Sequence, residues 1–241
     1  MQSRIQPILR IVTVVLVIGI VAVAGLIVAA VLDTDKTPTN IVEKAVFEAE
    51  EAVRANPENA DARIKLSAAY TQNGAFAAAT EQATIAIRLD PTNPAAHYAL
   101  GLAQSKSGDT KAAITTLNKA ATLEGQLAGF YADVWAALAK AYERDEQIDK
   151  AIEAMNEALN FGPENSEMLF QRGSLYERTE QWVDALYDYY QATAYVSDHE
   201  EALAGIERIS ESHPEAIPEV RERFGVGEDG SLDATAPAPA E

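Results

Sequence analysis

The 241-residue chain contains no cysteine. This excludes disulfides, thiolate catalysis and cysteine metal sites, and it leaves the redox compartment open. Histidine is scarce, with only three residues, and none of them stands at the spacing of a zinc protease motif. A glycine-rich phosphate loop is also missing, and the lysines are scattered along the sequence. We therefore expect no catalytic site, no cofactor and no metal, and we do not expect an enzyme.

Basic residues are few, with 19 lysines and arginines against 37 aspartates and glutamates, which gives a net charge of −18. So acidic a chain repels nucleic acids and anionic lipid head groups, and we expect neither as a partner. The charge also fits a second reading, in which it is only a solvated surface that keeps a helical array in solution.

Charge and proline are both missing from residues 11–32. A helix over this run would be about 33 Å long, enough for a bilayer core of about 30 Å. Arg4 and Arg10 precede the run, and no acidic residue occurs before Asp33. The positive side of a membrane helix stays in the cytoplasm. The pattern predicts a single-pass protein of a bacterial cytoplasmic membrane, with residues 1–10 inside and the rest outside.

A cleaved signal peptide is the alternative for the same run. Ala22 and Ala24 offer small residues at a cleavage-like spacing. However, the apolar run continues through Leu26 to Leu32 and does not turn polar. This continuation favours an anchor in the lipid bilayer over a cleaved signal.

After a short polar linker, residues 33–39, amphipathic helical patterns occupy most of the chain. Residues 132–163 contain the clearest pair of helices, ended by Pro163. Their apolar residues recur at spacings of three and four: Trp135, Leu138, Ala139 and Tyr142, then Ala151, Met155 and Ala158. Large residues beside small ones on such stripes allow two antiparallel helices to pack closely.

The same pair of patterns recurs three more times. Pro57 and Pro91 lie 34 residues apart, and each ends an alanine-rich helical pattern. The recurring sets are Leu66, Ser67 and Tyr70 with Ala79, Ala83 and Ala86; Leu100 and Gly101 with Ala113, Leu117 and Ala120; and Leu169, Gly173 and Tyr176 with Ala185, Tyr189 and Ala192. This period and these residues resemble the tetratricopeptide repeat family. Arg172 departs from the family pattern by standing in the place of its leucine.

The resemblance implies an all-α solenoid of helical hairpins. We expect a half repeat at residues 40–59, four full repeats at 60–197, a capping helix region at 198–224 and a disordered acidic tail at 225–241. The third repeat starts 38 residues after the second, so four extra residues lie at 128–131, where we expect Phe130 and Tyr131 to be exposed. Ser197 and Glu200 fit a capping box for the helix that follows.

In the resembled family, the first helix of each repeat lines a concave groove that binds partners. The corresponding positions here are Ile64 and Ala68, Tyr98 and Leu102, Ala136 and Lys140, and Phe170 and Ser174. Only Lys140 is of the type that holds carboxylate-terminated peptides. The groove therefore favours a helical or extended apolar segment of a protein or peptide partner. In the alternative reading, these side chains simply seal adjacent first helices against each other.

These patterns predict a membrane-anchored adaptor or scaffold that binds a protein partner at the extracytoplasmic membrane face. In layout the chain resembles anchored repeat proteins that act in envelope assembly, at translocons and as apoprotein binders in cytochrome c maturation. A structural subunit, permanently integrated in a membrane complex or self-assembled, is the alternative. Neither the partner nor the oligomeric state follows from the sequence.

Overall fold

The computed structural model describes residues 40–228 and 230–232. The chain divides into two units, Met1–Lys44 and Ala45–Glu241, and the second contains nearly all of the described residues. The predicted membrane span at residues 11–32 and the linker at 33–39 lie outside the described residues. Among the residues that are described, no helix combines the length and apolar character needed to cross a membrane.

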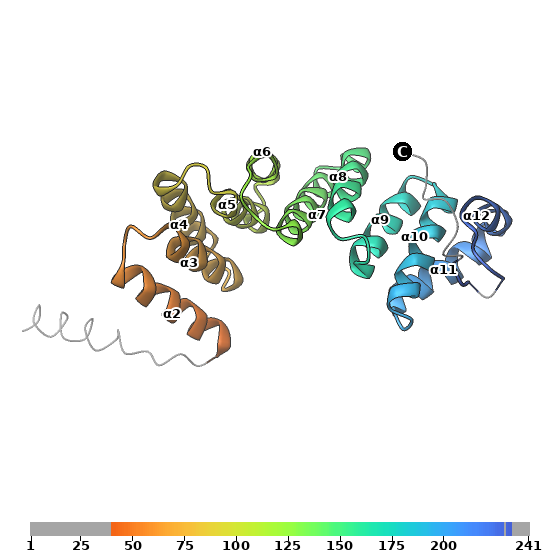
Figure 1. Ribbon diagram of the computed structural model, residues 1–241, viewed down its shortest axis with the longest axis horizontal. Coiled ribbons are helices and arrows are strands. Elements are labelled where there is room, and N and C mark those ends of the chain that lie inside the picture. The colour runs from red at the N-terminus through yellow and green to blue at the C-terminus, as the bar shows by residue number, and fades with distance from the viewer. Residues whose placement is uncertain (1–39, 229, 233–241) are drawn as a thin grey trace, which may run out of the picture. The chain divides into compact units, whose positions relative to one another are not determined.

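The described residues form eleven α-helices and no strand, apart from one isolated bridge. Helix α2 (Ile41–Ala55) comes first, and four pairs follow it in chain order (Figure 1). The pairs are α3 (Ala60–Gln72) with α4 (Phe76–Leu89), α5 (Pro94–Ser107) with α6 (Thr110–Thr122), α7 (Ala128–Arg144) with α8 (Ile148–Phe161), and α9 (Ser166–Arg178) with α10 (Trp182–Tyr195). Helices α11 (Glu200–Ser212) and α12 (Ala216–Phe224) close the series. The expected all-α fold of paired helices is confirmed.

Asparagine caps begin the first helix in three of the four pairs. The side chains of Asn59, Asn93 and Asn165 each accept a hydrogen bond from a backbone N–H of the first helical turn. The equivalent place in the third repeat is Tyr131, whose hydroxyl instead donates a hydrogen bond to the backbone oxygen of Leu123. Without a cap at that place, helix α7 begins earlier, at Ala128. The four extra residues therefore lengthen a helix and do not form a loop.

The turn between the two helices of each repeat contains one residue in the left-handed region. These residues are Gly74, Gly108, Glu146 and Glu180, with φ of 77°, 91°, 58° and 60°. Each lies fifteen residues after its repeat's capping place, so the backbone of the turn is the same in all four repeats. Glutamate adopts this conformation at a cost that glycine does not have.

Glycine in place of Glu146 or Glu180 should therefore stabilise the chain, by up to about 1 kcal/mol each. Relief of the left-handed strain is about 1–2 kcal/mol, and the greater freedom of glycine in the unfolded chain offsets part of it. Urea unfolding followed by circular dichroism measures the change. As a control, Glu157→Gly inside helix α8 should lower the stability by about 0.5–1 kcal/mol. A loss at Glu146 equal to the loss at Glu157 would contradict the assigned turn.

In repeats two to four, a small residue on the first helix faces a larger one on the second. A Cβ added at Gly101 would lie 2.6 Å from Leu117, and one added at Gly173 would lie 2.7 Å from Tyr189. Ala139 and Met155 occupy the same two places in the third repeat, and both are buried. The core of these three repeats is therefore fixed by complementary side-chain size.

Tyr189 also joins the last full repeat to the helix that follows it. Its ring is fully buried, and a Cβ added at Gly205 of helix α11 would lie 2.4 Å from that ring. Because Gly173 and Gly205 both leave space for one ring, helix α11 packs on α10 as a further layer of the array.

Both ends of the array differ from expectation. Helix α2 contributes no buried residue, so it covers its neighbours less completely than a half repeat should, although Tyr70 donates a 2.7 Å hydrogen bond to Glu50.

The expected capping box at Ser197 is wrong. Helix α11 is capped by His199, whose Nδ1 accepts from the Ala202 N–H. Residues 225–228 and 230–232 continue the fold, since Val226 is buried and bridges to Leu232.

Candidate partner-binding groove

Six of the eight predicted groove residues line two adjoining hollows on the first helices of repeats two to four. The larger hollow has a volume of about 370 Å³ and lies between α5, α7 and α9. It is lined by Tyr98, Leu102, Ser105, Lys106, Asp133, Ala136, Ala137, Lys140, Arg144, Asn165, Glu167, Met168 and Gln171. The smaller hollow, of about 120 Å³, is lined by Ala139, Lys140, Glu143, Met155, Phe170, Gln171, Ser174 and Leu175. Lys140 and Gln171 border both hollows.

The other two predicted residues, Ile64 and Ala68, line neither of these hollows. Both belong to α3, where Ile64 is half-buried and Ala68 is exposed. The structure therefore gathers the candidate site on repeats two to four and leaves the first repeat outside it.

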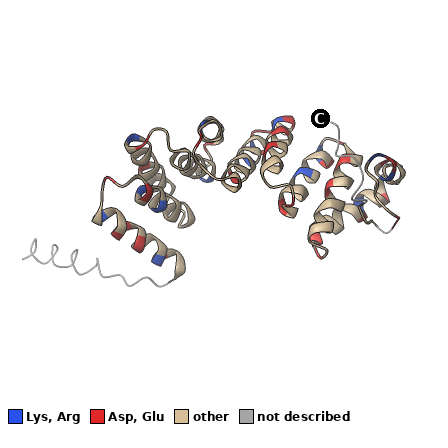
Figure 2. Ribbon diagram, in the orientation of Figure 1, with Lys and Arg blue, Asp and Glu red and all other residues tan. Residues whose placement is uncertain are grey.

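Two cationic side chains of the larger hollow were not among the predicted residues. Lys106 and Arg144 occupy the last turns of α5 and α7, one turn beyond the predicted places. The Arg144 guanidinium donates hydrogen bonds of 2.8 Å to the backbone oxygen and to Oγ of Ser105. Charged residues of both signs occur along the whole series of helices (Figure 2). The composition of the chain therefore does not reveal that cations outnumber carboxylates in the larger hollow.

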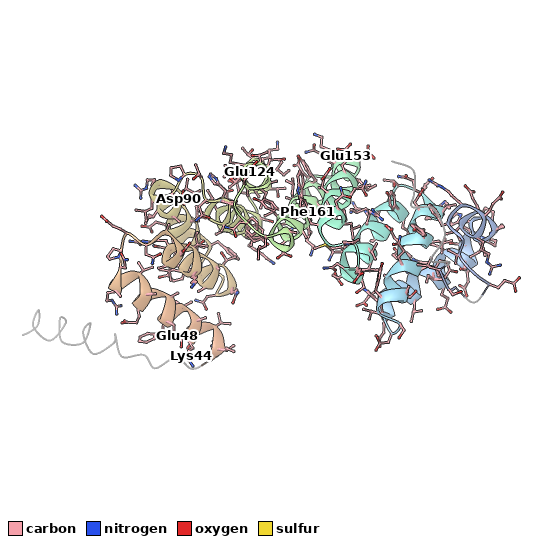
Figure 3. The ribbon with its side chains drawn as sticks, viewed as in Figure 1. Lys44, Glu48, Asp90, Glu124, Glu153 and Phe161 are labelled. Atoms are coloured by element: carbon pink, nitrogen blue, oxygen red, sulfur yellow. The ribbon has the colours of Figure 1, made fainter. Side chains whose placement is uncertain are left out.

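Tyr98 belongs to a row of aromatic rings that the extra turn of α7 completes. Its ring contacts Phe130 edge-on at 5.4 Å, Phe130 contacts Tyr131, and Tyr131 contacts Phe161. Phe130 and Tyr131 are half-buried, so the expectation that they are exposed is wrong. Phe161, labelled in Figure 3, is the more exposed end of the row. Burial, with a smaller contribution from Asp133, raises the pKa of Tyr98 to about 12.

Phe170 mainly packs within the protein. Its ring stacks on Tyr189 at 5.8 Å and contacts the ring of His199 at 5.3 Å. These contacts join α9 to α10 and to the start of α11. The reading in which predicted groove residues seal adjacent helices therefore describes Phe170 better than it describes Leu102 or Lys140.

Arg172, which departs from the family pattern, forms a bidentate ion pair with Asp188 of α10. The two hydrogen bonds measure 2.8 and 2.6 Å, and a third, of 2.9 Å, reaches Asn156 of α8. Asp188 is fully buried, and burial raises the pKa of its carboxyl group while the bonds from Arg172 oppose that rise. The pair lies away from both hollows and fixes three helices together.

A second polar network involves Glu177. It accepts two hydrogen bonds of 2.7 Å from Arg208 and one of 2.8 Å from the Tyr189 hydroxyl. The bond from Arg208 is the main reason that the pKa of Glu177 is lowered. This network satisfies the one polar atom of the buried Tyr189 ring. Among the described residues, no three histidine, aspartate or glutamate side chains gather as a metal ion would require.

Three tetratricopeptide repeat models match the chain, at residues 42–94, 84–115 and 132–175. The matched residues include most of helix α2, helices α3 to α8 in whole or in part, and most of α9. Residues 42–115 and 132–175 of the chain therefore match the tetratricopeptide repeat. A search of curated proteins found no match.

Solved structures, one of them described as a TPR protein, share the fold. A crystal structure of MamA has a TM-score of 0.53 and 24% identity over 72% of this chain and 98% of MamA. YrrB, described as a TPR protein with an unusual peptide-binding site, has a TM-score of 0.53 and 19% identity over 71% of this chain and 96% of its own. PilF of Pseudomonas aeruginosa has a TM-score of 0.55 and 16% identity over 75% and 88%. At these identities the likeness establishes the fold alone.

Proposed function

We propose that this repeat protein is an adaptor that binds a segment of a protein partner in the two hollows of α5, α7 and α9. The observation that supports this most directly is the larger hollow. It places the apolar side chains of Leu102, Ala136 and Met168 beside polar side chains on its edges. An apolar floor with polar edges suits a helix or an extended chain. The peptide-binding site in the description of the structurally similar YrrB supports the same class of function.

We propose further that the adaptor is held at a membrane by residues 11–32, with the repeats on the extracytoplasmic face of a bacterial cytoplasmic membrane. The support is the uncharged run preceded by Arg4 and Arg10. An anchor of this kind concentrates the groove near partners at the membrane surface. Envelope assembly, including apoprotein binding in cytochrome c maturation, is the setting that this layout suits. A subunit permanently integrated in a membrane complex is the second candidate.

Photo-crosslinking in isolated membranes tests the adaptor proposal. A photoreactive phenylalanine replaces Leu102 or Ala136 in the full chain, and Glu153 in a control. Glu153 is exposed on α8 and lines neither hollow (Figure 3). We expect both inner positions to give an adduct with the same protein, identified by mass spectrometry, and the control to give none. The adduct should stay with the membranes through an alkaline wash.

Three outcomes would contradict parts of this proposal. Equal crosslinking from Glu153 would contradict the proposal that the groove is the binding site. Release of the adduct by the alkaline wash would contradict the proposed membrane anchor. Recovery of the partner in one fixed stoichiometry after gentle detergent extraction, with no free chain, would favour the integrated subunit over the adaptor.

A further inference from the structure

The cations of the larger hollow gather at one end of it. Lys106 and Arg144 both lie in the last turn of their helices, and Arg144 reaches across to Ser105, the neighbour of Lys106. Lys140 lies one turn before Arg144 on the same face of α7. The lining carboxylates, Asp133 and Glu167, lie in the N-terminal parts of α7 and α9. The hollow therefore has a cationic end in a chain whose net charge is −18.

Within the described part of the chain, no carboxylate forms an ion pair with the cations of this end. Lys106 and Lys140 form no ion pair there, and Arg144 is held by the uncharged Ser105. Glu143, the nearest carboxylate along α7, lines the smaller hollow and is bound by Arg178 at 2.6 Å. Like charges one helical turn apart, such as Lys140 and Arg144, destabilise a helix unless an anion compensates them.

The helix dipole explains only part of this arrangement. A basic residue in a last turn is stabilised by the partial negative charge of a helix C-terminus, which accounts for Lys106 and Arg144. Lys140 lies outside the last turn and borders both hollows. A free lysine at the junction of two hollows is instead placed to contact whatever fills them.

From this charge complementarity we infer that the hollow takes an acidic segment of the partner protein, with carboxylates against Lys106, Lys140 and Arg144. The inference rests on the proposed function and specifies the chemistry of its partner. A segment that alternates acidic and apolar residues fits best, because Leu102, Ala136 and Met168 form the floor beside the cations. Long polyanions are disfavoured because the rest of the chain repels them.

Binding of a synthetic peptide tests the inference. The probe is a short fluorescein-labelled peptide of alternating leucine and glutamate, and its counterpart has glutamine for each glutamate. The full chain should bind the glutamate peptide at least about tenfold more tightly in fluorescence anisotropy, which is about 1.4 kcal/mol. Added salt should reduce this preference, since partly exposed charges are screened.

Charge reversal identifies the residues responsible. Lys106→Glu combined with Lys140→Glu should abolish the preference for the glutamate peptide. The matched control combines Lys111→Glu and Lys119→Glu on α6, which changes the net charge equally and also reverses one last-turn lysine. The control should keep the preference within about twofold. Circular dichroism should show unchanged helix content in both variants, because all four lysines are exposed.

Equal weakening by the two variants, or equal binding of the two peptides, would overturn the inference. These results are separate from those of the crosslinking experiment. If Leu102 and Ala136 crosslink to a partner and the charge reversal has no effect, the groove binds an apolar segment and only the charge assignment fails. If neither inner position crosslinks, the proposed function fails as well.

Discussion

Leucine in place of Asp188 alone should lower the free energy of unfolding by about 3–5 kcal/mol. The Asp188 side chain is 1% exposed and that of Arg172 is 14% exposed. The variant leaves a nearly buried guanidinium whose remaining contacts are the hydrogen bond to Asn156 and the ring of Tyr176. Removing one member of a buried pair has this cost because the remaining charge loses its compensation. Arg172→Leu should likewise lower the free energy of unfolding, but this loss should become smaller as the pH falls. The buried carboxyl group of Asp188 then becomes neutral by protonation.

Arg172→Leu together with Asp188→Leu should recover most of that loss. The double variant restores the leucine of the family pattern and leaves no buried charge, a change that is often neutral or stabilising. Urea unfolding of the two single variants and the double variant measures the coupling between the residues. As a control, Glu143→Leu breaks the exposed pair with Arg178 and should cost no more than about 1 kcal/mol. If the losses of the two single variants simply add in the double variant, the ion pair is not the cause.

Most of the repeat architecture could be predicted from the sequence, because the sequence gives the size of each side chain on the helix faces. The same two places of their repeats are occupied by Gly101 with Leu117 and by Gly173 with Tyr189. In the structure, the two members of each pair lie against each other. A strong period of small and large residues specifies which faces meet. It specifies the register of the helices without any knowledge of long-range contacts.

Element boundaries were predicted less well, because they depend on individual caps. The extra residues before the third repeat became a helical turn since Tyr131 replaces the capping asparagine. The asparagines at Asn93 and Asn165 could have revealed this, as they define a capping place that Tyr131 breaks. No comparable signal marked His199, which caps α11 with a ring nitrogen in place of the usual amide, hydroxyl or carboxylate oxygen.

Only part of the candidate site could be predicted from the sequence. The resemblance to the repeat family implied the inner-face positions, and four of them, Tyr98, Leu102, Ala136 and Lys140, line one hollow. Lys106 was missed because the last turn of α5 extends the inner face farther than the predicted positions. The role of Phe170 was left open between binding and packing, because its neighbours, Tyr189 and His199, come from elements whose packing the period does not specify.

Alanine in place of Leu138 should cost about 2–5 kcal/mol, near the upper end of that range. Leu138 is fully buried in the largest core cluster, so its removal loses apolar burial and leaves a cavity. The cost depends on how far the surroundings can fill that cavity. The same cluster contains Ala139, Ala154 and Ala158, whose short side chains cannot extend into the space. Relaxation is therefore limited at this site.

The position of Leu138 in the third of four repeats should make the effect general. Each repeat contacts only its neighbours, so a weakened central repeat uncouples those on either side. We expect Leu138→Ala to lower the melting temperature and to broaden the transition seen by circular dichroism. The exposed Glu153→Ala on the partner helix α8 should change stability by no more than about 0.5 kcal/mol. Equal changes in the two variants would show that Leu138 does not face the core, and with it that the register of the third repeat is wrong.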